Sequence, residues 1–305
     1  MTYSIVARDK DTGELGVAVQ SHYFQVGPVV PWALAGVGAV ATQSQVNIAY
    51  GPLGLELLQA GYTAEQALTA LTAGDPYADV RQCAIVDANN RVAAHTGVKC
   101  IPAAGHVLGD GFSCQANLME KDTVWTAMAD AYTSTEGPLA ERMMAALEAA
   151  EAEGGDIRGK QSAAMLVVTG SPTGRSWEDR IIDLRVEDAG DPLPELRRLL
   201  RVKRAYMALG EADRITEAGE RGQAMTVAED AIRIAPEMVE IRFWTGLEIA
   251  MNGDLDRGCD LLAEVIREKG DRWMETLRRL AIVGRVPPEK LEVIERRLAA
   301  AAVGK

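Results

Sequence analysis

The fold is decided by residues 1–21, MTYSIVARDKDTGELGVAVQS. Thr2–Arg8 alternates its side chains and is rich in strand formers, and Gly16–Gln20 repeats this character after a turn cluster at 9–13. The stretch therefore predicts a β-hairpin that begins at the second residue. Because a terminus tied into a sheet is held in place, we expect Thr2 in a fixed position beside the end of the returning strand.

Met1 precedes a small residue, which is the context in which an aminopeptidase removes the initiator methionine. Removal would leave Thr2 with a free α-amine beside its own hydroxyl, so that one residue would carry both a nucleophile and a general base. This pair is the working part of an N-terminal-nucleophile (Ntn) hydrolase. Met-Thr is also a common protein start, so the dipeptide has to be weighed with the rest of the chain.

Length and composition set the limits for the whole chain. It has 305 residues, roughly twice a typical domain length, which predicts two domains. Hydrophobic residues make up 48% and charged residues 25%, as in ordinary soluble globular proteins. The net charge of −12 argues against nucleic acid as a partner, because phosphate binding needs a concentrated positive surface.

The sequence predicts a cytoplasmic protein without a membrane partner, because it has neither a run of about 18 apolar residues nor a signal-peptide pattern. The cysteines are widely spaced and lack a C-x-x-C motif, so we expect free thiols, buried or half-buried, at Cys83, Cys100, Cys114 and Cys259. The histidines show no metal-binding spacing. We therefore expect no metal and no cofactor.

Further strands and helices follow the first hairpin in a recognisable order. Periodicity and turn residues predict strands at 29–43, 80–87, 91–96, 106–118, 162–169 and 180–186, and helices at 54–60, 63–71, 122–132 and 138–152. Hairpins within such an order favour an α+β domain over alternating βαβ units. Two antiparallel sheets sandwiched between helical layers would satisfy the pattern.

The character of the chain changes near residue 190 to continuous helix. Ala231-Ile232-Arg233 and Val265-Ile266-Arg267 stand 34 residues apart, which is the tetratricopeptide period. We therefore divide the chain into a sheet domain at 1–190 and a small all-α, tetratricopeptide-like domain at 191–305. Residues 210–302 would form an oligomerisation or protein-partner surface, and we expect a homodimer or larger assembly.

Several separated segments resemble, in order, an uncharacterised Ntn-hydrolase-like family catalogued as a domain of unknown function. They are residues 2–9, 16–21 and 36–43, Gly109-Asp110-Gly111 with Gln115 and Asn117, and residues 159–164. The resemblance spans 1–187 and implies an αββα four-layer sandwich, here with an appended helical C-terminal domain. It does not settle activity, because function belongs to the site rather than to the fold.

Two residues compete for the role of nucleophile in this interpretation. Thr2 and Ser4 are two apart and point to the same face of the strand. Removal of Met1 would expose the amine of Thr2, whereas Ser4 would also need the removal of Thr2 and Tyr3. We favour Thr2, with Ser4 orienting it, and leave Ser4 as the alternative.

The remaining candidates follow from what amide hydrolysis requires, with weight from the resemblance. Gln43, Gln115 and Asn117 are candidate donors for an oxyanion, and Ser21 would hydrogen-bond the nucleophile region. Asp183 or Arg185 would fix the α-amine or a substrate carboxylate. We therefore expect Thr2, Ser4, Ser21, Gln43 and Asn117 to take part in catalysis, and Gln20, Gln115, Asp183 and Arg185 to bind substrate.

Two functions follow from these observations. The first is an amidohydrolase that cleaves an amide, urea or carbamate C–N bond of a small molecule, with Thr2 as nucleophile. The second is a non-catalytic Ntn fold that serves as a protein-interaction or assembly module through its helical repeats. The sequence does not specify the substrate.

Overall fold

The computed structural model describes residues 2–303, with the side chains of 221 and 301–303 outside that description. Met1, whose removal the sequence predicts, also lies outside the described residues. The chain divides into a sheet unit that ends at Leu199 and a helical unit that begins at Leu200. This division falls inside a single helix, α5 (Pro192–Glu217), whereas the sequence interpretation placed the boundary at 190.

The larger sheet of the sheet unit is antiparallel and has the strand order β10-β9-β2-β1-β8-β7 over the described residues. Its strands are β1 (Thr2–Arg8), β2 (Leu15–Ser21), β7 (Gly105–Gly109), β8 (Phe112–Asn117), β9 (Ser162–Val168) and β10 (Arg180–Val186). The predicted first hairpin is confirmed, and β1 lies between β2 and β8 near the middle of the sheet. The chain start is therefore central to the fold.

The smaller sheet is also antiparallel, with the order β3-β4-β5-β6 over the described residues. Its strands are β3 (Pro31–Leu34), β4 (Gly38–Ser44), β5 (Arg81–Asp87) and β6 (Val92–Thr96). The prediction of one buried strand over 29–43 is wrong, because a turn separates β3 from β4. Gly36 adopts a φ of +68° there, a conformation that glycine reaches at little cost.

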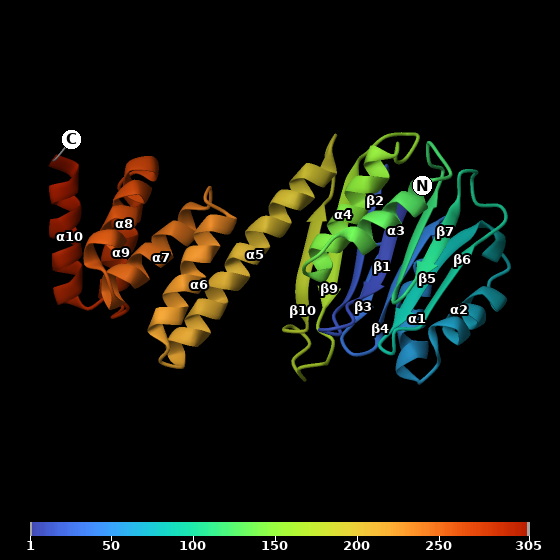
Figure 1. The fold of residues 1–305 in the computed structure, drawn as a ribbon, viewed down its shortest axis with the longest axis horizontal. Helices are drawn as coiled ribbons and strands as arrows, with labels where there is room; N and C mark the ends of the chain where they lie inside the picture. The colour runs from blue at the N-terminus through green and yellow to red at the C-terminus, as the bar shows by residue number, and fades with distance from the viewer. Residues whose placement is uncertain (1, 304–305) are drawn as a thin grey trace. The chain divides into compact units, whose positions relative to one another are not determined.

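Helices cover the outer face of each sheet, so the described part of the sheet unit has mixed α+β architecture, as predicted (Figure 1). The helices α3 (Val124–Ser134) and α4 (Leu139–Ala152) pack on the larger sheet, and α1 (Tyr50–Gln59) and α2 (Ala64–Ala73) pack on the smaller one. A short 3-10 helix, Ala78–Val80, leads into β5. Thr63 and Gln66 form the predicted capping box at the start of α2.

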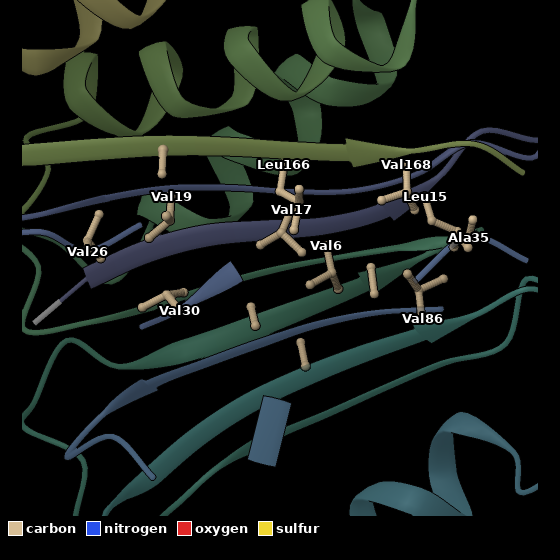
Figure 2. Packing of buried hydrophobic residues seen from close by; sticks show 14 residues of the cluster. Val6, Leu15, Val17, Val19, Val26, Val30, Ala35, Val86, Leu166 and Val168 are labelled. Atoms are coloured by element: carbon tan, nitrogen blue, oxygen red, sulfur yellow. The ribbon is translucent and has the colours of Figure 1, made fainter. Parts of the chain in front are cut away.

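The two sheets face each other across an apolar core. Figure 2 shows Val6, Val17 and Val19 of the larger sheet in this core, together with Val86 of the smaller sheet. Side chains alternate along a strand, so Thr2 and Ser4 share the face of β1 that carries Val6 and point into the same space between the sheets. The space between the sheets is therefore apolar around Val6, and it receives polar side chains at the end where Thr2 lies.

The helical unit begins within α5 and continues through five further described helices. They are α6 (Arg221–Ile234), α7 (Val239–Asn252), α8 (Leu255–Lys269), α9 (Arg272–Ile282) and α10 (Pro288–Val303). Its core is apolar, and the ring centroids of Phe243 and Trp273 lie 4.8 Å apart within it. No helix within residues 2–303 is both long and apolar enough to cross a bilayer.

Candidate functional site

Thr2 begins the central strand β1 and is 5% exposed. It lies directly opposite Ser21 on β2 and Asn117 on β8. The hydroxyl oxygens of Thr2 and Ser21 are 2.9 Å apart, and either hydroxyl can donate. The structure thus brings together the preferred nucleophile and the residue predicted to hydrogen-bond it.

The backbone of Thr2 is held by two amide side chains. Gln43 on β4 donates through Nε2 to the carbonyl oxygen of Thr2 at 3.2 Å, and Asn117 donates through Nδ2 to the same oxygen at 3.4 Å. The contact from Gln43 links the smaller sheet to the larger one at Thr2, whereas the contact from Asn117 lies within the larger sheet. They restrict the direction in which Thr2 presents its hydroxyl.

Ser4 lies deeper in the space between the sheets and is fully buried. Its hydroxyl donates to Oε1 of Gln43 at 2.7 Å and accepts from Nε2 of Gln115 at 2.6 Å. Ser4 therefore acts on Thr2 through Gln43, because it fixes the amide that holds the Thr2 carbonyl. The Gln115 amide is fixed in turn by Ser113, which donates to its Oε1 at 2.8 Å.

Gln82 on β5 is the residue that sequence reasoning missed. Its Oε1 accepts from Gln43 at 2.7 Å and from Asn117 at 2.8 Å, so it joins the two amides that hold Thr2. We call Ser4, Gln43, Gln82, Gln115 and Asn117 the amide network. The available signal was a glutamine in front of the apolar run 83–86, on a strand expected to be buried.

The amide network continues away from Thr2 towards a histidine. Nε2 of Gln82 donates to Oγ1 of Thr96 at 2.9 Å, and the Thr96 hydroxyl lies 2.8 Å from Nδ1 of His106. Burial and the neighbouring His95 lower the pKa of His106. The imidazole is thus biased towards its neutral form at neutral pH.

The side-chain amides of the network donate their hydrogen bonds to other groups of the site. Gln43 Nε2 has three acceptors within reach for two hydrogens, namely the carbonyls of Thr2 and Gln115 and the Oε1 of Gln82. The expected oxyanion donors are therefore engaged in positioning. Oδ1 of Asn117, in contrast, is a buried acceptor that has no hydrogen-bond partner among the described residues.

Gln20 lies on the other face of the larger sheet. Side chains alternate along β2, so Gln20 points towards the helices because Ser21 points towards Thr2. Gln20 is fully buried, and neither its Nε2 nor its Oε1 has a partner among the described residues. Its cross-strand neighbour Tyr3 donates to Glu151 of α4 at 2.8 Å. The structure does not bring Gln20 to the Thr2 hydroxyl.

Asp183 and Arg185 lie on β10, the edge strand of the larger sheet. Both residues are exposed, and Nε of Arg185 donates to Oδ1 of Asp183 at 3.0 Å. With β9 and β2 between β10 and β1, the separation is three strand spacings, or about 14 Å. The structure does not place these residues at Thr2, because strand order in the sheet differs from strand order in the sequence.

Thr2, Ser21 and the amide network carry hydroxyls and amides, none of which titrates near neutral pH. A base for the Thr2 hydroxyl has to come from elsewhere, and an α-amine on Thr2 itself would supply one. Within residues 2–303, no group of three or more His, Cys, Asp or Glu side chains is placed to hold a metal ion. All four cysteines are buried free thiols, as predicted.

Comparisons with known proteins add to this geometry. A family model described as a family of unknown function, DUF1028, matches residues 2–196. The crystal structure of SPO2555 from Silicibacter pomeroyi, a DUF1028 protein, is 30% identical and has a TM-score of 0.60 over 66% of this chain and 84% of that one. Anbu (ancestral β-subunit) from Yersinia bercovieri matches 65% of this chain and 92% of its own with 14% identity and a TM-score of 0.33, a likeness that carries no argument. No curated protein matches the chain.

Proposed function

The chain belongs to DUF1028, a family of unknown function, and we propose an activity for it from the geometry of the site. The proposed protein is an Ntn-type amidohydrolase that cleaves a C–N bond of a small molecule. The observation that carries the proposal is the pair of hydroxyls at the start of the central strand, where Thr2 Oγ1 lies 2.9 Å from Ser21 Oγ. The two facing sheets with helices outside agree with an αββα sandwich. Thr2 is the first residue of that arrangement.

In the proposed reaction the α-amine of Thr2, free after the loss of Met1, takes the proton of the Thr2 hydroxyl. The oxygen attacks the substrate carbonyl, and the C–N bond breaks as the leaving nitrogen receives that proton. Water then hydrolyses the ester formed on Thr2. We assign Oδ1 of Asn117 to the amine, because it is a buried, unpaired acceptor on the residue opposite Thr2.

The amide network acts in this proposal as a positioning device. Its uncharged side chains hold the Thr2 carbonyl from two sides and leave the proton transfer to the amine. Such fixed polar groups lose little free energy to reorganisation during a reaction. Amides, ureas and carbamates are all within the proposed substrate class.

Thr2→Val and Thr2→Ser test the proposal. Valine keeps the shape of threonine and lacks its hydroxyl, whereas serine keeps the hydroxyl. In a screen of amides, ureas and carbamates we expect hydrolysis by the wild type and by Thr2→Ser, and none by Thr2→Val. Thr69→Val, at an exposed threonine of α2, is the matched control and should hydrolyse like the wild type. Equal turnover by Thr2→Val and the wild type would exclude Thr2 as the nucleophile.

One observation favours the second function, a non-catalytic module that gathers subunits or binds a protein through residues 210–302. The amide network satisfies most of its own hydrogen bonds, as a purely structural network would. For this alternative we expect a homodimer or larger assembly, which light scattering at micromolar concentration measures. Inactivity of the wild type across the whole screen, together with stable assembly, would favour it.

A further inference from the structure

A cavity of about 420 Å³ lies inside the helical unit, between α5, α6 and α7. Ligand pockets in proteins usually have volumes of roughly 300–1,000 Å³, so this cavity can hold a small molecule. All of its lining residues belong to the helical unit. It therefore shares no described lining residue with the site at Thr2.

The floor of the cavity is built from small and apolar side chains. Ala212, Ala224 and Ala228 are buried and leave space that no larger side chain fills, and we call them the alanine floor. Thr245 of α7 also lines the cavity and is fully buried. Its Oγ1 has no hydrogen-bond partner among the described residues, which costs free energy unless a bound group supplies one.

The rim of the cavity is acidic. Among the side chains that the structure describes, Asp213, Glu240 and Glu248 line it, and Arg285 is the one basic lining residue. These three carboxylates, which we call the acidic rim, are exposed. Their excess of negative charge favours a cation over an anion in the cavity.

Two aromatic side chains line the cavity beside the acidic rim. The Tyr206 hydroxyl donates to Oε2 of Glu240 at 2.7 Å, and Nε1 of Trp244 lies 3.4 Å from the other oxygen of that carboxylate. Burial, and then the hydrogen bond to Glu240, raise the pKa of Tyr206 to about 12, so the phenol stays a donor at neutral pH. Aromatic faces next to carboxylates are a favourable environment for an ammonium group.

We propose that this cavity binds a small organic cation, with its ammonium group at the acidic rim, its apolar body on the alanine floor and a hydrogen-bonding group paired with Thr245. The carboxylates of the acidic rim would repel an anion, and a purely apolar molecule would leave the Thr245 hydroxyl without a hydrogen-bond partner. A molecule with an ammonium group, an apolar body and a second hydrogen-bonding group satisfies each of these features. This proposal does not depend on the chemistry at Thr2.

Three probes that share one skeleton test the proposal by calorimetry on the full chain. Tyramine carries both an ammonium and a phenolic hydroxyl, 2-phenylethylamine lacks the hydroxyl, and tyrosol replaces the ammonium by a neutral alcohol. We expect saturable binding of tyramine, with each of the other two bound about fivefold more weakly. No saturable binding of tyramine at millimolar concentration, or equal binding of tyrosol, would overturn the proposal.

Variants assign the two ends of the probe. Thr245→Val keeps the shape of the side chain and should abolish the preference for tyramine over 2-phenylethylamine without lowering the melting temperature. Glu248→Gln and Asp213→Asn should each reduce the preference for tyramine over tyrosol. Glu292→Gln, at an exposed glutamate of α10, is the control and should leave both preferences unchanged.

Two outcomes would contradict these assignments. If Thr245→Val retained the full preference for tyramine over 2-phenylethylamine, the pairing with Thr245 would be wrong. If Glu292→Gln weakened binding as much as Glu248→Gln does, the attraction would come from the overall negative charge, and the acidic rim would not be the binding site.

Discussion

Thr2 and Ser21 lie opposite each other across β1 and β2, and their hydroxyl oxygens are 2.9 Å apart. The same strands pair Val6 with Val17 four residues further along, in the apolar core. The chain therefore passes, within one strand, from a polar end built around Thr2 to the packed centre of the sandwich. A polar layer at the end of a rigid core suits a positioned nucleophile, because the strands fix its direction.

The proposed chemistry requires that the mature chain begins at Thr2. We expect intact-mass spectrometry of the protein to show the loss of Met1. A residue placed permanently in front of Thr2 should abolish turnover, because it converts the amine into an amide that cannot accept the proton. Full turnover by such an extended chain, once its mass is confirmed, would contradict the proposed base.

Gln82 provides a test of the amide network that does not depend on any substrate. Gln82→Met removes the oxygen that accepts from Gln43 and Asn117, and leaves these buried donors short of a partner. We expect a loss of about 3 kcal/mol in the free energy of unfolding, measured with urea. Gln59→Met, at an exposed glutamine on α1, should change it by less than about 0.5 kcal/mol. A loss as small as that of the control would show that Gln82 does not support the network.

The sequence predicted a strand or helix well where neighbouring residues alone determine it. Alternation predicted β1 and β2, and Thr63 with Gln66 predicted the start of α2. The turn at Gly36 was missed because the residues on both sides are apolar and read as one strand. The 34-residue repeat in the helical unit stays a prediction.

The site was harder to predict, because it depends on which strands become neighbours. Gln82 reaches the site only because β5 pairs with β4, which places it opposite Gln43. Asp183 follows β9 closely in the chain, but β10 becomes the edge strand, far from β1. The sequence alone was enough to exclude Gln20 from the site. Neighbouring residues on a strand face opposite sides of the sheet, so only one of Gln20 and Ser21 can face Thr2.

The hydrogen bonds of Asp75 predict how the stability of the sheet unit changes in acid. Its carboxylate accepts from Nε of Arg81 at 2.8 Å, from the backbone N–H of Tyr77 at 2.8 Å and from the hydroxyl of Tyr50 at 3.1 Å. The hydrogen bond from Arg81, followed by those from its other partners, lowers the pKa of Asp75 in the folded state. Because the folded pKa lies below the unfolded one, the carboxylate stabilises the fold above about pH 4 and this stabilisation is lost as the pH falls further.

Asp75→Asn should therefore lower the free energy of unfolding most at neutral pH. The difference in this free energy between the variant and the wild type should become smaller as the pH falls towards about 3. Urea denaturation across this range measures the difference. Asp79→Asn, which alters an exposed ion pair with Lys99, should show little difference at any pH. A difference for Asp75→Asn that stays constant with pH would exclude this carboxylate as a source of acid sensitivity.

The last prediction concerns where the sheet unit ends. Leu193 and Leu196 of α5 are buried, and Arg197 donates to Glu141 and Glu148 of α4, so the first turns of α5 belong to the sheet unit. A chain that ends at Leu199 keeps these contacts and should be monodisperse. Because every residue assigned to the proposed reaction precedes α5, it should also retain the hydrolysis seen with the full chain.

A chain that ends at Asp191 loses the same contacts, and we expect it to aggregate, because removal of the leucines exposes the apolar surface that they cover. Size-exclusion chromatography with light scattering separates the two outcomes. Arg197→Ala in the full chain removes the ion pairs but keeps the leucines, and should remain monodisperse. If the chain ending at Leu199 were monodisperse and folded but inactive where the full chain is active, the helical unit would have to contribute to the reaction, and the assignment of catalysis to Thr2 and its neighbours alone would be wrong.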